Sequence, residues 1–425
     1  MLKFRWETEF KETEIGEIPK DWEVRKIEEI ADVSTGGTPS RKNEEYWGGD
    51  INWVKSQEVR KYFIWETEEK ITEKGMRKSN AKRIYLPNTV LIALYGATAG
   101  EAALLKVPAT VNQAIAALEG HKTNNLFLFY LLLANKERLK DISIGSAQQN
   151  LYLKDIKNFE VALPPANDEQ SRIATVLSWF DDLIENKKRQ NEILEKVAMA
   201  IFKSWFVDFE PFKDEEFVYN EELGKEIPKE WKVKKLGKLI KIESGGYAPQ
   251  GEKYFTNGKY PFVRVKHLSN QPCINGCDFI NDDAVRDYKL KLFKEGSIIF
   301  QKSGESLSFA RVNILPFDCY IVNHLAIVDS AESKNLGFIY CVLKNLLFEI
   351  IEERTGTALP YMKISDIQKK IILKPPDSIL QRFHSLVEPL FQKIILNQKQ
   401  IMVLRKIRDA LLPKLVFGKL RVVEI

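Results

Sequence analysis

Cysteine and histidine are scarce in this chain, which has four of each among 425 residues. Four cysteines cannot supply the dense disulfide framework of small secreted domains, and all of them (Cys273, Cys277, Cys319, Cys341) lie in the second half. Cys273 and Cys277 stand near His267, but their spacing and the lack of a second cysteine pair do not fit a structural zinc site. We therefore expect ordinary thiols and no metal.

Long hydrophobic runs are missing as well. The longest, LFLFYLLLA at residues 126–134, is too short to span a bilayer, and the polar start MLKFRWETEFKETEIG is unlike a signal peptide. We expect a soluble, cytoplasmic protein that makes no membrane contact. Hydrophobic residues form 44% of the chain, enough for two or three domains with cores of their own.

Signatures of catalysis are also absent. Neither Pro164-Pro165 nor Pro375-Pro376 lies between Asp or Asn and an aromatic residue, the arrangement with which amino-methyltransferases hold a target base. No glycine-rich dinucleotide turn follows a strand, and after the stretch 246–251 Glu252 stands where a phosphate-binding loop needs lysine. With no conspicuous pair of nucleophile and base, we expect no enzymatic activity and no cofactor.

What the chain does contain is a repeat. EIPKDWEVRKIEEI at residues 17–30 returns as EIPKEWKVKKLGKL at 226–239, and the correspondence continues through TGG and SGG, VNQ and VNH, and GSA and GTA. A period of about 210 residues is far longer than that of a solenoid, so the chain consists of two related copies. A monomer with approximate twofold symmetry suits a roughly symmetric target such as double-stranded nucleic acid.

The first part of each copy alternates short apolar runs with Gly, Pro and Asn. TVLIALY at 89–95 and GSIIFQ at 296–301 are examples, and they predict short strands. One helical stretch is expected in each copy, near 124–140 and 335–352. The fold class is therefore α+β, with a mixed α/β domain and a curved sheet in each copy.

The second part of each copy is helical. Residues 168–206 and 377–415 contain no glycine, and apolar residues recur every three and four positions. We expect two long helices in an antiparallel coiled coil of about 27 residues, roughly 40 Å. Pro389 predicts a short helix before the long one in the second copy. The second-copy seam comprises Leu390, Ile394, Asn397, Ile401, Leu404, Arg408, Leu411 and Leu415.

Two features of the helices go beyond a simple apolar seam, namely the asparagines in the pattern and a second apolar row. Asn397 and its counterpart Asn186 either fix the register of the seam or face water. The first-copy helix carries two apolar rows, which one partner helix cannot bury, so we expect a protein partner there. The candidate partner-binding residues are Trp179, Phe180, Leu183, Ile193, Val197 and Trp205. The resulting domain boundaries are 1–166, 167–212, 213–376 and 377–425.

Loops beside the expected strands are rich in groups that bind DNA. Arg and Lys match guanine O6 and N7, Asn and Gln match adenine N6 and N7, and paired glycines can expose N–H donors to a phosphate. A net charge of +5 is compatible with this. For each residue, and for Asn112 and Asn323 in particular, a solvated loop or a closed turn is the alternative. The candidates are Thr35, Gly36, Gly37, Thr38, Lys55, Ser56, Gln57, Arg77, Lys78, Asn112, Gln113, Gln148, Gln149, Asn150, Gly245, Gly246, Tyr247, Arg264, Lys266, His267, Lys302, Ser303, Asn323, His324 and Tyr361.

Several segments together resemble the specificity subunit of type I restriction-modification systems, over essentially the whole chain. They are IPKDWEVRKI and IPKEWKVKKL, STGGTPS with YWGGDINWV, YGATAGEAAL with VNQAIAAL, PPANDEQSRIATVLSWFDDLI, and ALLPKLVFGKLRV. DSILQRFHSLVEP departs from the usual pattern, because no acidic residue precedes Gln381.

The resemblance implies a non-catalytic subunit with two target-recognition domains. Each would recognise one half of a bipartite, asymmetric DNA sequence, and the helices would set the spacing. It also implies two docked methyltransferase subunits, which bind S-adenosylmethionine, and a restriction or translocase subunit that can join. A stand-alone DNA binder and an enzyme with unrecognised chemistry are the alternatives. Since residues 417–423 correspond to 206–212, we expect the end of the chain to pack near the first domain.

Overall fold

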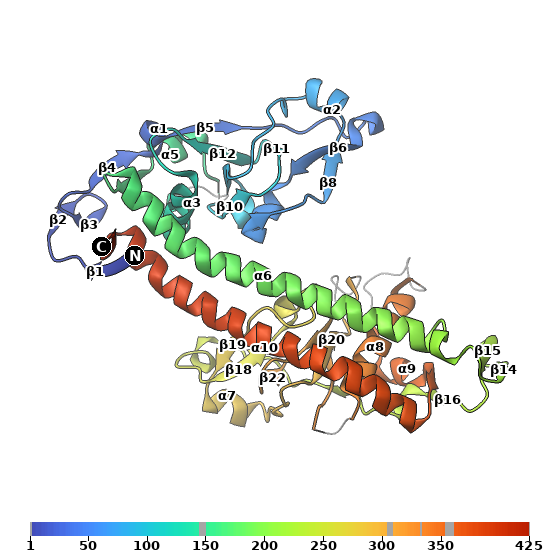
Figure 1. The fold of residues 1–425 in the computed structure, drawn as a ribbon. Coiled ribbons are helices and arrows are strands. Elements are labelled where there is room, and N and C mark those ends of the chain that lie inside the picture. The colour runs from blue at the N-terminus through green and yellow to red at the C-terminus, as the bar shows by residue number, and fades with distance from the viewer. Residues whose placement is uncertain (1, 144–149, 304–308, 332–333, 353–360, 425) are drawn as a thin grey trace. The chain divides into compact units, whose positions relative to one another are not determined.

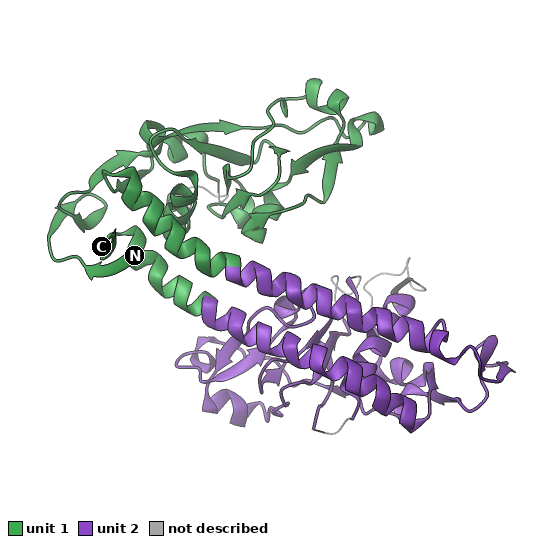
Figure 2. Cartoon of the chain, viewed as in Figure 1, with its two compact units in different colours: residues 1–182, 405–425 green, residues 183–404 purple. Residues whose placement is uncertain are grey.

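The computed structural model describes residues 2–143, 150–303, 309–331, 334–352 and 361–424 (Figure 1). These residues divide into two compact units, coloured separately in Figure 2. Unit 1 comprises residues 1–182 and 405–425, and unit 2 comprises residues 183–404. Each unit therefore contains one α+β copy and a part of each long helix. Within the described residues, no helix is both long and apolar enough to cross a membrane.

Unit 1 is built on a five-stranded sheet in the order β5-β12-β9-β10-β7 and a three-stranded sheet in the order β11-β6-β8. The central strand of the larger sheet is apolar and fully buried along its length, as TVLIALY predicts. The bounds are β5 (Ala31–Thr35), β6 (Trp47–Val54), β7 (Phe63–Ile64), β8 (Glu69–Ile71), β9 (Val90–Ala93), β10 (Ala102–Leu105), β11 (Ala109–Val111) and β12 (Ile115–Gly120).

The helical stretch expected near 124–140 is two helices, α3 (Asn125–Ala134) and α4 (Lys136–Ser143). The Asn124 side chain caps α3 by accepting from the N–H groups of Leu126 and Phe127. Asn135 is buried between the two helices and ends the first. The shorter elements of unit 1 are α1 (Ile27–Ile30), α2 (Glu73–Arg77), α5 (Leu153–Asn158), η1 (Glu44–Tyr46), η2 (Ser56–Lys61) and η3 (Gly96–Thr98).

Unit 2 repeats most of this topology. Its larger sheet has the order β17-β23-β20-β21, one described strand fewer than in unit 1, and its smaller sheet has the order β19-β18-β22. These strands correspond in sequence to strands of unit 1. The bounds are β17 (Glu243–Ser244), β18 (Tyr260–Val263), β19 (Asp278–Ile280), β20 (Ile298–Gln301), β21 (Val312–Ile314), β22 (Tyr320–Ile321), β23 (Leu325–Val328), α7 (Asp282–Asp287), α8 (Leu336–Glu352), α9 (Ile364–Lys369), η5 (Leu236–Lys238), η6 (Glu252–Tyr254) and η7 (Val265–His267). The duplicated sequence is thus a duplicated fold.

Two long helices, α6 (Asn167–Phe206) and α10 (Asp377–Val416), run antiparallel (Figure 1). In unit 2, Asn397 Nδ2 donates to Asn191 Oδ1 at 2.9 Å and Lys187 Nζ donates to Gln400 Oε1 at 2.6 Å. Residue numbers rise along one helix as they fall along the other, which confirms the antiparallel coiled coil. In the seam, Ile394, Asn397, Ile401 and Leu415 are buried.

The helices differ from the prediction in length and continuity. Each has 40 residues rather than about 27. The break expected at Pro389 is absent, because α10 runs on through it. Val387 and Phe391, on either side of the proline, are buried in the core of unit 2, and this packing offsets the lost backbone hydrogen bond. Of the two candidate register residues, Asn397 is buried and pairs with the buried Asn191, whereas Asn186 is exposed.

In unit 1, the first and last strands pair with each other. β1 (Leu2–Trp6) lies antiparallel to β25 (Leu420–Glu424), with Leu2 opposite Glu424. This confirms that residues 417–423 return to the first domain. The remaining two-stranded pairs are β2 (Phe10–Thr13) with β3 (Gly16–Pro19), β4 (Glu23–Lys26) with β13 (Glu160–Leu163), β14 (Phe217–Asn220) with β15 (Lys225–Pro228), and β16 (Lys232–Lys235) with β24 (Ile371–Lys374); η4 (Glu210–Phe212) precedes β14.

Candidate nucleic-acid interface

One edge of unit 1 collects many of the candidate residues. β6 and β11 are parallel, with Val54 opposite Val111, so Lys55 and Asn112 leave their strands at the same edge. Asn112 N–H donates to Val54 O at 3.0 Å, and the TGG loop joins them through Gly37 N–H, which donates to Val111 O at 2.9 Å. Thr38 Oγ1 donates to Gln113 Oε1. Three segments far apart in the sequence thus form one polar surface.

The paired glycines have an internal role at this edge. A Cβ on Gly36 would lie 1.8 Å from Val111 O, and one on Gly37 would lie 2.6 Å from Asn80 Cβ. A Cβ on Gly245 would likewise lie 2.4 Å from the carbonyl oxygens of Ile321 and Val322. Glycine is needed at these positions because nearby atoms of the same polypeptide leave no room for a Cβ atom.

The prediction that Gly36 and Gly37 expose N–H donors to a phosphate is wrong for Gly37, and the glycine pair of unit 2 is bonded in the same way. The N–H groups of Gly37, Gly245 and Gly246 all donate to backbone carbonyls. Asn112 likewise closes a turn, because its Oδ1 accepts from Ala114 N–H at 3.0 Å. DNA contact by any of these residues stays a prediction.

Trp47 and Trp53 form an aromatic cluster that packs beneath the TGG loop and donates one hydrogen bond to it. Trp53 is buried and its Nε1–H donates to Gly37 O at 2.9 Å. Trp47 packs edge-on against Trp53, and the Arg41 guanidinium lies 3.7 Å from the centre of the Trp47 ring. Arg41 was not among the predicted site residues, although it directly follows the conspicuous STGGTPS segment.

The other candidates of unit 1 are more scattered. Asn150 forms a bridge with Tyr95, which follows β9 at the same edge. Ser56 and Gln57 lie in η2, next to Lys55. Arg77 ends α2 and pairs with Glu73 at 3.0 Å, and Lys78 follows it; both are exposed. Gln148 and Gln149 lie outside the described residues.

The corresponding edge of unit 2 has the same construction. Val322 N–H donates to Val263 O at 3.0 Å, and Gly246 N–H donates to Ile321 O at 2.9 Å. Asn323 N–H in turn donates to Gly246 O at 2.7 Å. The loop that contains Gly245 and Gly246 is therefore held beside the ends of β18 and β22.

Further candidates converge on this second edge. Lys302 Nζ donates to Ser244 Oγ at 2.8 Å, and Ser303 Oγ lies 2.9 Å from His324 Nδ1. Ser303 also forms a bridge with Tyr361, the counterpart of the Tyr95 bridge in unit 1. Tyr247 is 73% exposed. Hydroxyl, ammonium, imidazole and phenol groups thus line one surface, which suits hydrogen bonding to base edges and phosphates.

Carboxylates neutralise part of the positive charge at both edges. In unit 1, the Glu68 carboxylate, and to a smaller extent that of Glu69, raises the pKa of the Lys55 ammonium, whereas burial lowers it. In unit 2, burial would raise the pKa of Asp278, but hydrogen bonds from Lys266 and Arg264 outweigh it and lower that pKa. Burial lowers the pKa of the neighbouring His267, which favours its neutral form.

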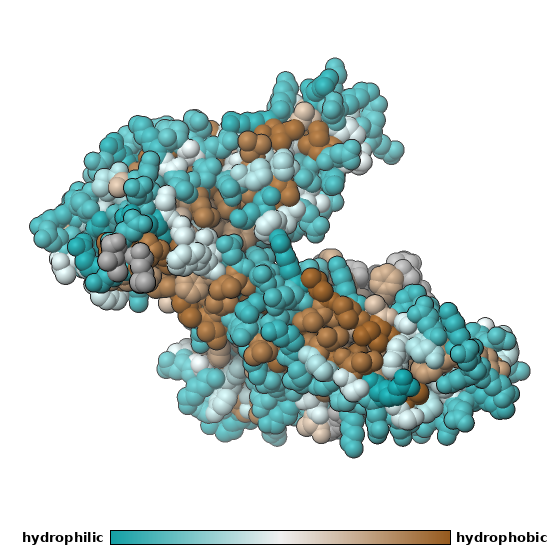
Figure 3. Space-filling view, in the orientation of Figure 1, coloured by the Kyte–Doolittle hydropathy of each residue, from teal (hydrophilic) through white to brown (hydrophobic). Residues whose placement is uncertain are grey.

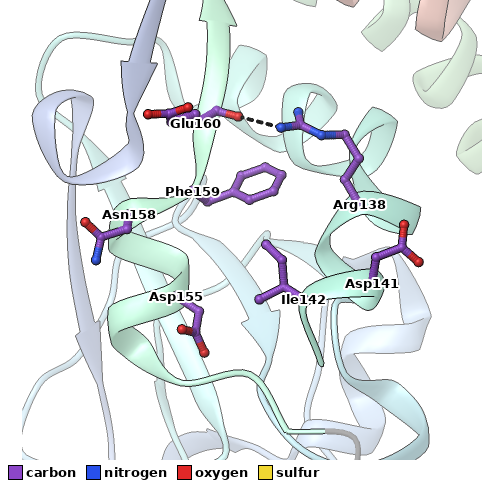
Figure 4. A pocket seen from close by; sticks show the side chains of 7 residues that line it. All are labelled: Arg138, Asp141, Ile142, Asp155, Asn158, Phe159 and Glu160. Carbon is purple, nitrogen blue, oxygen red and sulfur yellow. Dashed lines mark hydrogen bonds between the residues drawn. The ribbon is translucent and has the colours of Figure 1, made fainter. Parts of the chain in front are cut away.

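Within the residues that the structure describes, no three His, Cys, Asp or Glu side chains are grouped as metal ligands. Burial raises the pKa of the Cys273 thiol. A pocket of about 490 Å³ is lined by Arg138, Asp141, Ile142, Asp155, Asn158, Phe159 and Glu160 (Figure 4). Arg138 donates to the Glu160 carbonyl there, and of the predicted site residues that the structure describes, none lines this pocket.

The apolar row expected on α6 is exposed in the structure. Leu183, Ile193 and Val197 are 51%, 60% and 42% exposed in unit 2. Figure 3 shows apolar surface over α6 and α10 in this unit. Trp179, in unit 1, is also exposed.

Two other predicted partner-binding residues pack against the hydrophobic cores of the protein itself. Phe180 packs against the core of unit 1 and Trp205 against that of unit 2. Their contact with a partner, like that of the exposed row, stays a prediction.

Each of the two units thus carries one copy of the polar edge on an α+β fold, together with parts of the two antiparallel helices. Residues 19–196 and 228–406 both match the family described as type I restriction modification DNA specificity domain. The chain belongs to this family of type I restriction-modification specificity subunits. The two matched segments repeat at the same offset as the sequence and the fold.

Individual relatives agree with the family assignment. The chain is 56% identical over 432 residues to the type I restriction enzyme MjaIX specificity subunit of Methanocaldococcus jannaschii, covering 100% of this chain and 99% of that protein. It is 23% identical over 356 residues to the HindI specificity subunit of Haemophilus influenzae, covering 69% of this chain and 77% of the relative. The crystal structure of the type I S subunit from M. genitalium has the same fold, with a TM-score of 0.52, 18% identity, and 93% and 96% of the two chains covered.

Proposed function

We propose that the polar edge of unit 1 recognises one half of a bipartite DNA sequence and that of unit 2 recognises the other half. The observation that carries this proposal is the duplicated edge with different side chains on it. Lys55 is replaced by Arg264 and Gln113 by His324 at equivalent positions. The same scaffold with different donors and acceptors would select different bases, which makes the target asymmetric.

The proposal extends to the organisation of the chain. The recognition domains are residues 1–166 and 213–376, and the helical regions are 167–212 and 377–425. The helices set the distance between the two half-sites. The chain itself is non-catalytic and acts in the cytoplasm, where the methylation and cleavage chemistry belongs to other subunits.

We also propose that the exposed apolar row of α6 binds a methyltransferase subunit, two of which dock on the helices. Leu183, Ile193 and Val197 would otherwise leave large apolar side chains exposed to water on one helix. A restriction or translocase subunit can join the same complex. The relatives are named as specificity subunits of type I restriction enzymes, which supports assembly with other chains.

Mapping of methylated bases tests the recognition proposal. The full chain is assembled with its cognate methyltransferase and S-adenosylmethionine and is given a library of random duplexes. We expect two short, different motifs at a fixed separation. Exchanging residues 17–165 for another recognition domain should change one motif and leave the other intact. A stable complex that modifies no DNA, or that loses both motifs after the exchange, would overturn the proposal.

Substitution on the apolar row tests the docking proposal. Val197→Glu places a charge on the exposed row and should weaken capture of the methyltransferase by the chain. Val218→Glu is the matched control, because Val218 is similarly exposed, at 37%, but belongs to β14 rather than to α6 or α10. Equal capture by wild type and Val197→Glu would place the partner elsewhere. No capture by the wild type would favour a stand-alone DNA binder.

A further inference from the structure

The polar edge of each unit contains an equivalent ion pair, which the sequence alone did not reveal. Lys55 and Arg264 occupy equivalent positions directly after β6 and β18. Each pairs with a carboxylate at the start of the neighbouring antiparallel strand, Glu69 in β8 and Asp278 in β19. The strand register is also the same, with Trp53 opposite Glu69 and Phe262 opposite Asp278.

The backbone of both cations is fixed in the same way. Lys55 N–H donates to Glu58 Oε2 at 3.0 Å, and Arg264 N–H donates to His267 Nδ1 at 2.9 Å. Glu58 and His267 each stand three residues after the cation, at the first turn of η2 and η7. A cation with its main chain capped and its side chain paired is therefore a duplicated feature of these edges.

In unit 2 the pairing leaves one side of the guanidinium available. Arg264 Nε donates to Asp278 Oδ2 at 2.5 Å, and Nη2 contacts the same oxygen. Lys266 Nζ donates to Oδ1 of the same carboxylate at 2.8 Å. Within the described part of the chain, Nη1 of Arg264 has no hydrogen-bond acceptor. The outer side of the fork, Nη1–H and the second N–H of Nη2, remains for a ligand.

The position of the Arg264 side chain suits contact with a base. It is 37% exposed, so it is accessible, and its guanidinium lies 5.2 Å from the centre of the Phe255 ring. Phe255 and Asp278 together restrict the plane of the fork. Two parallel N–H groups match the O6 and N7 acceptors that guanine presents in the major groove. Lys55 in unit 1 has no planar fork and is flanked by two carboxylates, so the same chemistry is not available there.

We propose that Arg264, oriented by Asp278, recognises a guanine in the half-site of the second recognition domain. Asp278 is a positioning residue, since it holds the guanidinium and touches no base. The inference rests on the proposed function, because it requires a half-site that unit 2 recognises. It adds the base identity and the two side chains that select it.

Modified DNA tests this contact directly. Once the wild-type target has been mapped, the half-site that survives the exchange of residues 17–165 belongs to unit 2. Its guanines are replaced singly by 7-deazaguanine, which lacks the N7 acceptor, and binding by the full complex is measured. We expect one position at which affinity falls by about 5- to 150-fold. Arg264→Met should lose a similar factor on normal DNA and should no longer respond to 7-deazaguanine at that position.

Two further variants separate orientation from charge and from folding. Arg264→Lys keeps the charge but not the fork, so it should retain non-specific binding and lose the guanine preference. Asp278→Asn should also lose the preference while non-specific binding becomes tighter, with a salt dependence steeper by about one phosphate contact. Arg286→Met is the matched control, because Arg286 pairs with Asp283 and Asp287 on α7 of the same unit. Melting temperatures of all variants check the fold.

The outcomes are distinguishable. A wild-type complex without a bipartite motif would overturn the proposed function and this inference with it. A bipartite motif whose second half contains no guanine, or whose response to 7-deazaguanine persists in both Arg264 variants, would overturn the inference alone. Full guanine discrimination by Asp278→Asn would remove its positioning role.

Discussion

Replacement of Arg421 by methionine should destabilise unit 1 strongly. Arg421 lies in β25, its side chain is 9% exposed, and it pairs with Glu7, Glu169 and Asp21. The Glu7 and Glu169 side chains are themselves only 8% and 7% exposed. Methionine fills most of the volume but leaves two buried carboxylates without their cation, the situation in which a lost ion pair costs most.

The size of the effect follows from this burial. Removing one partner of a buried ion pair costs about 3–5 kcal/mol, whereas the half-exposed Asp21 adds only about 0–1 kcal/mol. Unit 1 has about 200 residues, and in a domain of that size each kcal/mol lowers the melting temperature by about 2–4 °C. We expect the transition of unit 1 to fall by about 6–24 °C. Arg25→Met, which removes an exposed pair with Glu23, should change it by less than about 4 °C.

The pH dependence supplies a second observable. The hydrogen bond from Arg421 lowers the pKa of Asp21. Burial would raise the pKa of Glu7, but hydrogen bonds from the backbone N–H groups of Glu9 and Thr8, and then from Arg421, lower it. Carboxyl groups with a depressed folded-state pKa stabilise the fold above their unfolded pKa of about 4, and this contribution is lost as pH falls through the folded value. The cost of Arg421→Met should therefore be full at neutral pH and shrink below about pH 4.

Differential scanning calorimetry of the two variants, at neutral and acidic pH, measures both effects. Adding Glu169→Gln to Arg421→Met should recover part of the loss, because it removes one of the unpaired charges. A loss below about 1 kcal/mol at neutral pH, on the order of an exposed pair, would refute the reasoning. So would a cost of Arg421→Met that stays constant between neutral and acidic pH.

Two substitutions and one insertion test the seam, the first recognition edge and the spacing. Asn397→Leu should cost about 1–3 kcal/mol, because it leaves the buried Asn191 Oδ1 without a donor, and a second change, Asn191→Leu, should recover part of this in thermal unfolding. Gly36→Ala would place a Cβ 1.8 Å from Val111 O, so methylation mapping should show loss of the first half-site while the second is kept. Seven residues inserted at the same level in α6 and α10 add about 10 Å, and the gap between half-sites should widen by about three base pairs. An unchanged gap would show that the helices do not set it.

The sequence predicted the strands and the long helices well where the local pattern was unambiguous. Val90–Ala93 and Ile298–Gln301 are short, continuous apolar runs and both are fully buried central strands. The helix break at Pro389 was wrong because local propensity does not include the tertiary packing that holds α10 together. The seam partner of Asn397 was also missed, since it depends on the register between two helices, which neither helix encodes alone.

The candidate site was predicted as a set of loops but not as a set of contacts. Arg41, Glu69 and Asp278 were overlooked because their ion pairs join adjacent strands or loops distant in sequence. The sequence around a charged residue in a short strand does not indicate which residue of the adjacent strand it will pair with. The glycine pairs were misinterpreted for a similar reason. A glycine in the sequence indicates a position with no room for a side chain, but it does not show whether a ligand or the protein itself occupies the adjacent space.

The pairing of β1 with β25 has a consequence for how such a protein can be encoded. Leu2 stands opposite Glu424, and Cα atoms paired in this way lie about 4.5–5.5 Å apart, so a peptide of a few residues could join them. New ends could then be opened in the exposed segment 213–216, before β14. Such a circular permutant would begin with the second copy and end with the first while it keeps every strand pairing described above. The order in which the two copies follow each other in the gene is therefore not dictated by the fold.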